Sequence, residues 1–187
     1  MDMKNLQNQI LIAMPSLEDG YFERTVTYIC EHNENGAMGI VINQPLEMKV
    51  TDLLAQIKVP LKDKLILPEI PVYAGGPVSP ERGFVLHRPQ QKWQSSMQLT
   101  PDIMVTTSRD LLESIGTKDE PEDYLICLGY AGWEKGQLEQ ELLDNAWLTI
   151  PADADLIYTT PIHLRWQQAS EVLGIATWQI SNQIGHA

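Results

Sequence analysis

The feature that most constrains the fold is a pair of strand-like runs separated by a polar turn. Side chains in residues 25–32 alternate between two faces, with Val26, Tyr28 and Cys30 on the same side. Residues 37–43 follow, and their centre is β-branched throughout. Alternation and β-branching are both typical of strands. The sequence therefore predicts two antiparallel neighbours in a sheet.

The turn between these runs contains Asn35-Gly36, a pair that tolerates the positive φ angles of a type I′ hairpin turn. If those residues form a two-residue loop, His32 lies opposite Gly39. A four-residue loop is the alternative, and it would shift that pairing. Both versions predict a β-hairpin.

Further short apolar runs predict strands, and runs with helical spacing predict helices. The expected strands are residues 9–14, 72–74, 83–87, 97–100, 104–107, 124–130, 147–150, 156–158 and 177–180. The expected helices are residues 50–57, 109–115, 134–145 and 162–173, with a turn at 16–23. Because strands outnumber helices and do not alternate with them one for one, we expect an α+β fold with a mixed sheet. The 187 residues fit one domain, residues 1–187.

The charge balance argues against several partners. The chain carries 13 basic and 25 acidic residues, a net charge of -12, so its field repels polyanions. Direct contact with nucleic acid is therefore not expected. No run approaches the roughly 20 apolar residues of a membrane span, so no membrane role is expected. Cys30 and Cys127 lie in apolar runs without CxxC spacing, as reduced cysteines of a cytoplasmic protein do.

Glycines and a tryptophan stand out in residues 129–142, GYAGWEKGQLEQEL. The pattern predicts a buried strand, a turn and then a helix. Phosphate loops aim backbone N–H groups at an anion from a helix N-terminus, but Glu134 and Glu141 would repel an anion at this helix. The sequence therefore favours a sharp strand-to-helix corner at Gly129 and Gly132 over a phosphate site.

Polar side chains on the predicted helix form a stripe. Glu134, Gln137 and Glu141 are spaced so that they share one helix face. Such a stripe is usually solvated, but it could also bind a protein partner or a cationic ligand. Trp133 is expected to fill an apolar gap beside it. Trp133, Glu134, Gln137 and Glu141 are therefore candidate binding residues.

A second glycine bend, Gly75-Gly76, precedes Pro77. Paired glycines allow a tight turn whose backbone amides could line a pocket, and a plain strand-end turn in a curved sheet is the alternative. Asn43 and Gln44 end the predicted hairpin and offer polar groups of their own. These four residues, Asn43, Gln44, Gly75 and Gly76, complete the candidate ligand or partner surface.

Patterns for catalysis, metals and direct DNA reading are missing from the sequence. It contains no GxSxG or HExxH motif and no basic helix-turn-helix. We therefore expect no catalytic residue, no metal and no cofactor. An enzyme that uses a carboxylate, Glu134 or Glu141, remains an alternative.

Several motifs in order resemble the bacterial AlgH/YqgE family: LIAMP at 11–15, GAMGIVINQP at 36–45, RGFVLH at 82–87 and the 129–142 segment. The similarity covers essentially the whole chain. It implies an α+β domain whose mixed, strongly curved sheet closes into a barrel with helices packed outside. Members of the family are functionally uncharacterised. Their transcriptional-regulator label rests on no recognisable DNA-binding motif, and the resemblance implies no catalytic residues.

These observations together predict a cytoplasmic, non-enzymatic binding or regulatory protein. It would act through a protein partner or a small ligand at the two glycine turns and the polar stripe. A transcriptional regulator that contacts DNA directly is one alternative. A carboxylate enzyme at residues 129–141 is another.

Overall fold

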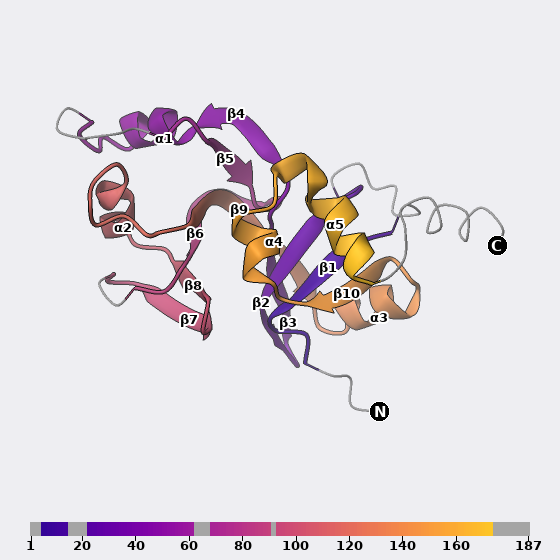
Figure 1. The fold of residues 1–187 in the computed structure, drawn as a ribbon. Helices are drawn as coiled ribbons and strands as arrows, with labels where there is room; N and C mark the ends of the chain where they lie inside the picture. The colour runs from indigo at the N-terminus through magenta and orange to yellow at the C-terminus, as the bar shows by residue number, and fades with distance from the viewer. Residues whose placement is uncertain (1–4, 15–21, 62–67, 91–92, 174–187) are drawn as a thin grey trace.

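The computed structural model describes residues 5–14, 22–61, 68–90 and 93–173, which form an α+β fold built on one curled sheet (Figure 1). The strands are β1 (Gln9–Ala13), β2 (Val26–Asn33), β3 (Gly36–Val41), β4 (Pro45–Lys49), β5 (Pro71–Ala74), β6 (Val78–His87), β7 (Ser96–Thr100), β8 (Ile103–Thr106), β9 (Tyr124–Glu134) and β10 (Trp147–Pro151). The helices are α1 (Val50–Gln56), α2 (Arg109–Ser114), α3 (Gln137–Leu143), α4 (Ala154–Tyr158), the 3-10 turn η1 (Ile162–Leu164) and α5 (Arg165–Val172). Of the expected turn at 16–23, residues 16–21 lie outside the described residues, as does the whole of the expected strand at 177–180.

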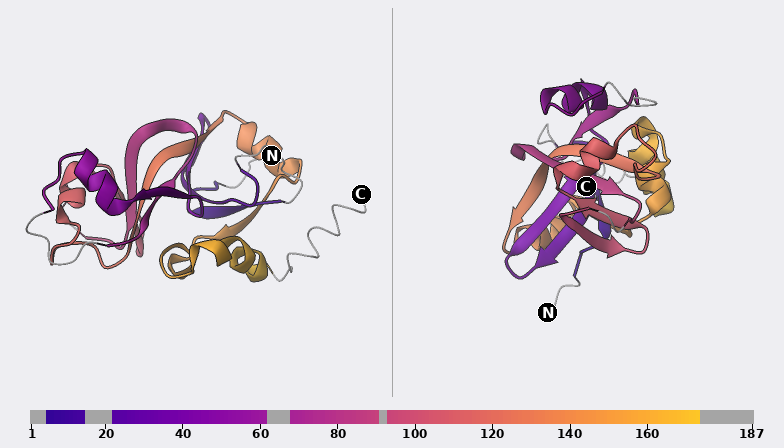
Figure 2. Two further views of the ribbon diagram at one scale, coloured as in Figure 1. Left: turned by 90° about the horizontal axis from the view of Figure 1, so that it is seen from above. Right: turned by 90° about the vertical axis from the view of Figure 1, so that its left-hand side faces the viewer.

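The sheet is mixed, as expected, and its strands follow the order β10-β1-β2-β3-β9-β6-β8-β7. Each of these neighbours pairs antiparallel, whereas β5 pairs parallel to β9 and antiparallel to β4. Strand β9 therefore joins two halves of the molecule, because it pairs with β3 on one side and with β5 and β6 on the other. Figure 2 shows the resulting elongated shape, with α1 and α2 at one end and α3 and α5 at the other.

The sheet curls into an open half-barrel, so the expectation of a closed barrel is wrong. Strands β10 and β7 end the strand order without pairing with each other. One side chain links the two sides: Asn8, next to β1, donates to the carbonyl of Leu99 in β7 at 3.1 Å. The Asn8 side chain also accepts from the hydroxyl of Tyr28 in the neighbouring strand β2 at 2.5 Å. Residue spacing along one strand does not show whether distant edge strands meet, which is why the sequence could not settle closure.

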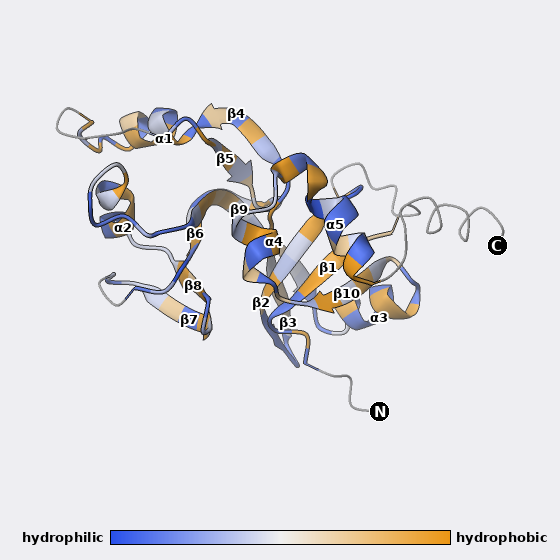
Figure 3. Cartoon of the chain, in the orientation of Figure 1, coloured by the Kyte–Doolittle hydropathy of each residue, from blue (hydrophilic) through white to orange (hydrophobic). Residues whose placement is uncertain are grey.

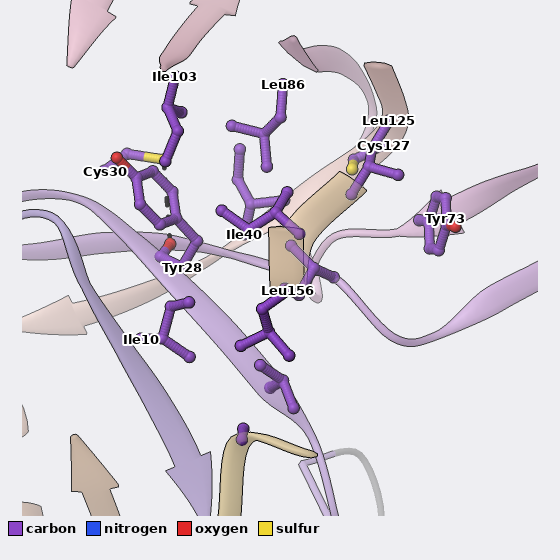
Figure 4. Close-up of a cluster of buried hydrophobic side chains, with 14 of the residues drawn as sticks. Ile10, Tyr28, Cys30, Ile40, Tyr73, Leu86, Ile103, Leu125, Cys127 and Leu156 are labelled. Atoms are coloured by element: carbon purple, nitrogen blue, oxygen red, sulfur yellow. Dashed lines mark hydrogen bonds between the residues drawn. The ribbon is translucent and has the colours of Figure 1, made fainter. Parts of the chain in front are cut away.

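Three apolar clusters hold the fold together. The largest fills the curl of the sheet under α4 and α5, and it includes Ile10, Tyr28, Ile40, Leu86 and Cys127 (Figure 4). A second lies under α1 and α2, and a third lies under α3. Figure 3 shows the hydrophobic residues concentrated along β1 and β10, where the first and third clusters are built. Burial of each such side chain contributes about 1.5–3 kcal/mol.

Residues 156–158 are helical, whereas a strand was expected. The segment forms α4, capped by Asp153, whose side chain accepts from the backbone N–H groups of Asp155 and Leu156. An apolar run this short carries no period that separates helix from strand. The available sequence signal for a helix was Asp153, whose carboxylate can cap the backbone N–H groups two and three residues later.

The β2–β3 hairpin has a two-residue loop, Glu34-Asn35, so neither of the two expected loops forms. His32 pairs with Ala37, which is the pairing that the four-residue loop would give, because Asn33 and Gly36 also pair. Gly36 is not a turn residue; it lies in the ladder, where an added Cβ would sit 2.2 Å from the Trp133 carbonyl oxygen. A bulge at Cys30 then changes the register, so that Ile29 pairs with Gly39. Because a bulge inserts one residue into the alternation, His32 reaches the α3 side of the sheet.

Candidate functional site

Gly129 and Gly132 lie within strand β9, so the expected strand-to-helix corner at these two residues is misplaced. Strand β9 continues to Glu134, with Gly132 and Trp133 paired to β3. The chain turns later, at Gly136, whose φ of +77° suits glycine. Helix α3 therefore begins at Gln137 rather than at Glu134, and Glu134 is a strand residue.

The two glycine turns serve close packing of backbone against backbone. Gly76, between β5 and β6, lies against Gly129 of β9. A Cβ on Gly129 would lie 2.4 Å from the Gly76 carbonyl oxygen, and one on Gly76 would lie 2.0 Å from the Tyr130 carbonyl carbon. Gly75 is equally crowded, with the Gly129 oxygen 2.4 Å from its virtual Cβ. Both Gly75 and Gly76 are buried. Their amides are thus enclosed by protein.

Asn43 and Gln44 are tied to neighbouring strands. The Asn43 side chain accepts from the Val26 N–H at 2.9 Å and donates to the Arg24 carbonyl at 3.0 Å. The Gln44 carbonyl accepts from the Ala74 N–H at 2.8 Å. These contacts explain the polar residues at the end of the hairpin as connections between β2, β3 and β5.

The residues of the polar stripe take part in a hydrogen-bond network within the protein, and Glu141 lies at its centre. One carboxylate oxygen of Glu141 accepts from the indole N–H of Trp133 at 3.0 Å and of Trp147 at 2.9 Å. Its other oxygen accepts from the Gln137 amide at 3.0 Å, and the Gln137 side-chain oxygen accepts from the Glu134 N–H. The network ties β9, α3 and β10 together. The Glu134 side chain is exposed.

A Glu–His pair beside this network was missed by the sequence analysis. His32 Nε2 lies 2.8 Å from Glu139 Oε1, and His32 Nδ1 accepts from the Leu6 N–H at 2.8 Å. Both ring nitrogens are engaged, so the pair joins the start of the chain to the hairpin and to α3. The Cys30 bulge turned His32 to this side. Within the described residues, His, Cys, Asp and Glu side chains form no group that could hold a metal ion.

The end of the molecule that carries α1 and α2 contains a groove that the sequence did not predict. It lies between α1, α2 and the sheet face of β6, β8 and β9, and its volume is about 220 Å³. Its apolar lining comprises Leu53, Ile57, Val85, Leu112, Ile126 and Leu128. Cavities of about 150 Å³ lined by aliphatic side chains hold benzene in other proteins. The groove is therefore large enough for a small organic molecule.

Part of the groove is open because Gly83, one of its lining residues, has no side chain. Gly83 precedes Val85 by two residues on β6 and pairs with Leu128 of β9, so it lies on the groove face. A Cβ added to Gly83 would have no described atom within 4 Å. The sequence placed Gly83 at the first residue of the predicted strand 83–87, whereas β6 begins at Val78 and Gly83 is a strand-interior residue. A glycine in such a position does not by itself distinguish an empty space from a crowded one.

The groove has a polar edge with fixed hydroxyl groups and two charges. Thr106 lines the floor, and its hydroxyl bonds to His87 Nε2 at 2.6 Å and to Ser96 at 2.7 Å. His87 is fully buried, and desolvation lowers its pKa below 6.5 despite the partial opposing effect of its bond to the Arg88 carbonyl. Glu81 and Arg109 lie at the rim.

The cysteines are not placed for chemistry. Cys30 and Cys127 are free and buried in the central cluster (Figure 4). Burial raises the pKa of the Cys127 thiol to about 12 and that of Cys30 still higher. Because the thiolate is the reactive form, these side chains act as small apolar groups.

The described helices include none that is long and apolar enough to cross a membrane.

Comparison with known proteins identifies close relatives along the full length of the chain. Proteins described as UPF0301 are 54% identical in Idiomarina loihiensis, over 99% of this chain and 100% of the relative, and in Serratia proteamaculans, over 98% and 100%.

Two solved structures have the same fold. The solution structure of AlgH from Pseudomonas aeruginosa is similar with a TM-score of 0.77 at 43% identity over 100% of both chains. A crystal structure of a Corynebacterium diphtheriae protein has a TM-score of 0.73 at 21% identity, covering 91% of this chain and 88% of that one, and shows the fold alone. The model of a family described as AlgH-like matches residues 10–178, and the chain therefore belongs to the AlgH-like family.

Proposed function

We propose that this AlgH-like protein is a non-enzymatic binding protein that holds a small ligand with an apolar body in the groove between α1, α2 and the sheet. The supporting observation is Gly83. Glycine inside a strand costs about 0.5–1 kcal/mol relative to alanine. Gly76 and Gly129 have a steric reason for that cost, because any Cβ would collide with backbone.

Packing gives no such reason at Gly83, where an added Cβ would enter empty space among the described residues and where φ is not positive. The missing side chain keeps the groove open over Leu128 and Ile126. Apolar pockets with a few placed polar groups are the usual form of small-molecule sites. Here the side chains of Glu81 and Arg109 at the rim would supply those polar groups.

Direct contacts join the elements around the groove, which lowers the ordering cost of binding. Arg109 of α2 donates to the carbonyls of Ile57 at 2.6 Å and Lys58 at 3.2 Å, at the end of α1. The two helices that wall the groove are thus joined directly. Helix α1 also packs Leu53 and Leu54 into the second apolar cluster.

The test uses 3-methylbutan-1-ol as a neutral branched-alkyl probe and the full chain labelled for NMR. We expect saturable shifts at groove residues such as Leu53 and Ile126 in the parent. The Gly83→Val variant should fold and lose them, because valine fills the open space. Gly132→Val is the control, since Gly132 is exposed on β9 and is not in the groove lining. Absence of shifts in the parent would reject the proposal.

A protein partner at the Trp133 side is a second candidate. A surface hollow of about 230 Å³ lies beside Trp133 and Met38, with the exposed acid Glu31 at its edge. Charge reversal tests it: Glu31→Lys should abolish a purified partner's binding and Glu113→Lys should not. Equal binding by both variants would exclude this surface.

Direct contact with DNA is the alternative carried by the family label. The net charge of -12 argues against it, and a gel shift that weakens steeply with salt would be needed to support it. A carboxylate enzyme finds little support at the predicted residues, because Glu134 is exposed and Glu141 is held by two indoles.

A further inference from the structure

We propose that the groove binds a small amphipathic amine, with the ammonium group at Glu81 and the apolar body over Val85, Ile126 and Leu128. This assignment of ligand class rests on the proposed function, since it concerns the same groove. The two charged residues at the rim, Glu81 and Arg109, differ in what they already contact.

The Glu81 carboxylate is available to a ligand. Glu81, Gly83 and Val85 alternate along β6 and all line the groove. Glu81 is exposed, and its carboxylate has no hydrogen bond or ion pair within the part of the chain that the structure describes. The adjacent Arg82 is directed elsewhere, because its guanidinium lies 5.3 Å from the ring centroid of Phe84, which belongs to the cluster on the opposite face.

Arg109, the other rim charge, is already engaged. Its guanidinium donates to the carbonyls of Ile57 and Lys58, and its Nε lies 3.5 Å from Glu113. Glu113 offsets part of the positive charge that would otherwise repel an ammonium group. An anionic ligand would have to compete with these contacts and would also approach Glu81. The net charge of -12 further enriches cations around the whole protein.

The groove volume limits the apolar body. About 220 Å³ exceeds the roughly 150 Å³ that holds benzene and is below the 300–1,000 Å³ typical of drug-sized sites. A branched alkyl chain or a single aromatic ring fits these limits. The ligand is therefore a monoamine of about this size rather than a nucleotide or a long-chain lipid.

The test compares three probes that share one carbon skeleton: 3-methylbutan-1-amine, 3-methylbutan-1-ol and 3-methylbutanoate. In NMR titrations at low salt, we expect the amine to bind about threefold more tightly than the alcohol, as an exposed ion pair allows, and the carboxylate to bind most weakly. About 0.5 M salt should remove the difference between amine and alcohol. Glu81→Gln should remove it too, with the affinity for the alcohol unchanged.

Glu134→Gln is the matched control, because it removes the same charge from an exposed site on β9 at the other end of the molecule. It should keep the preference for the amine. If the parent binds the alcohol but shows no preference for the amine, or if Glu81→Gln retains that preference, the amine assignment is wrong and the groove remains a small-molecule site. If the alcohol also fails to bind, the proposed function fails with it.

Discussion

The two ends of strand β9 differ in how their polar and glycine residues are used. At the α3 end, Glu141, Gln137 and Trp133 satisfy one another, and Gly36 of β3 is packed against the Trp133 carbonyl. At the α1 and α2 end, aliphatic side chains surround an open groove, and Gly83 faces empty space within the described residues.

Residues that are conspicuous in the sequence are therefore not the best indicators of a site in this protein. The fold needs Gly129 for close packing and Trp133 for a part-buried hydrogen bond to Glu141, although both stand out in the sequence as candidates for a site. The groove is lined by ordinary leucine, isoleucine and valine. What distinguishes the groove is the empty space beside Gly83, where an added Cβ would contact no described atom. Such a space is visible only in the three-dimensional structure.

The steepest loss of stability should come from Gly129→Ala. The substitution places a Cβ at a φ of +79° and 2.4 Å from the Gly76 oxygen. We expect at least about 3 kcal/mol of destabilisation, from backbone strain plus the clash. Urea unfolding measures it. Gly132→Ala on the same strand, where the nearest atom is 3.7 Å away, should change stability by no more than about 0.5 kcal/mol. Equal effects would show that Gly129 is not needed for packing.

Removal of the carboxylate that holds the α3 end together should cost less. Glu141→Ala leaves the indole N–H groups of Trp133 and Trp147 without their acceptor, which should lower the free energy of unfolding by about 2 kcal/mol. Glu134→Ala removes an exposed carboxylate nearby and should have little effect. If both variants unfold at the same urea concentration, the network does not contribute to stability.

A buried histidine under the groove floor should make stability depend on pH. The folded pKa of His87 is lowered by burial, so the unfolded state takes up the proton first as pH falls below about 6.5. Stability is therefore complete above that pH and decreases as pH falls, by up to about 1.4 kcal/mol per pH unit. His87→Gln should reduce the difference between unfolding free energies measured at about pH 7.5 and 5.5. An unchanged difference would contradict this assignment.

The mildest change is expected at the groove itself, with opposite sign. Gly83→Ala adds a Cβ where no described atom lies within 4 Å, and it should stabilise the protein by about 0.5–1 kcal/mol because alanine loses less conformational entropy. The midpoint temperatures of thermal unfolding of the Gly83→Ala variant, the Gly129→Ala variant and the parent protein check this contrast directly. A destabilised Gly83→Ala variant would mean that the space over β6 is not open.

Much of the fold could be predicted from the sequence. The β2 and β3 runs, helices α1 and α2 and the mixed character of the sheet follow from alternation, helical spacing and turn residues within a few positions of each other. The candidate site could be predicted only in part. Trp133, Gln137 and Glu141 do meet, but through the end of β9 and a later turn, and toward one another rather than toward a common open surface.

Local pattern was sufficient for secondary structure, composition class and the likeness to the AlgH-like family, because periodicity and turn chemistry act over neighbouring residues. Packing between distant segments settled the rest. The open edge between β10 and β7, the contact of Gly76 with Gly129 and the empty space over Gly83 each depend on how residues remote in the chain approach one another. The sequence shows the same residue type at a crowded position such as Gly129 and at an open one such as Gly83. Only the neighbouring atoms in the folded structure distinguish the two positions.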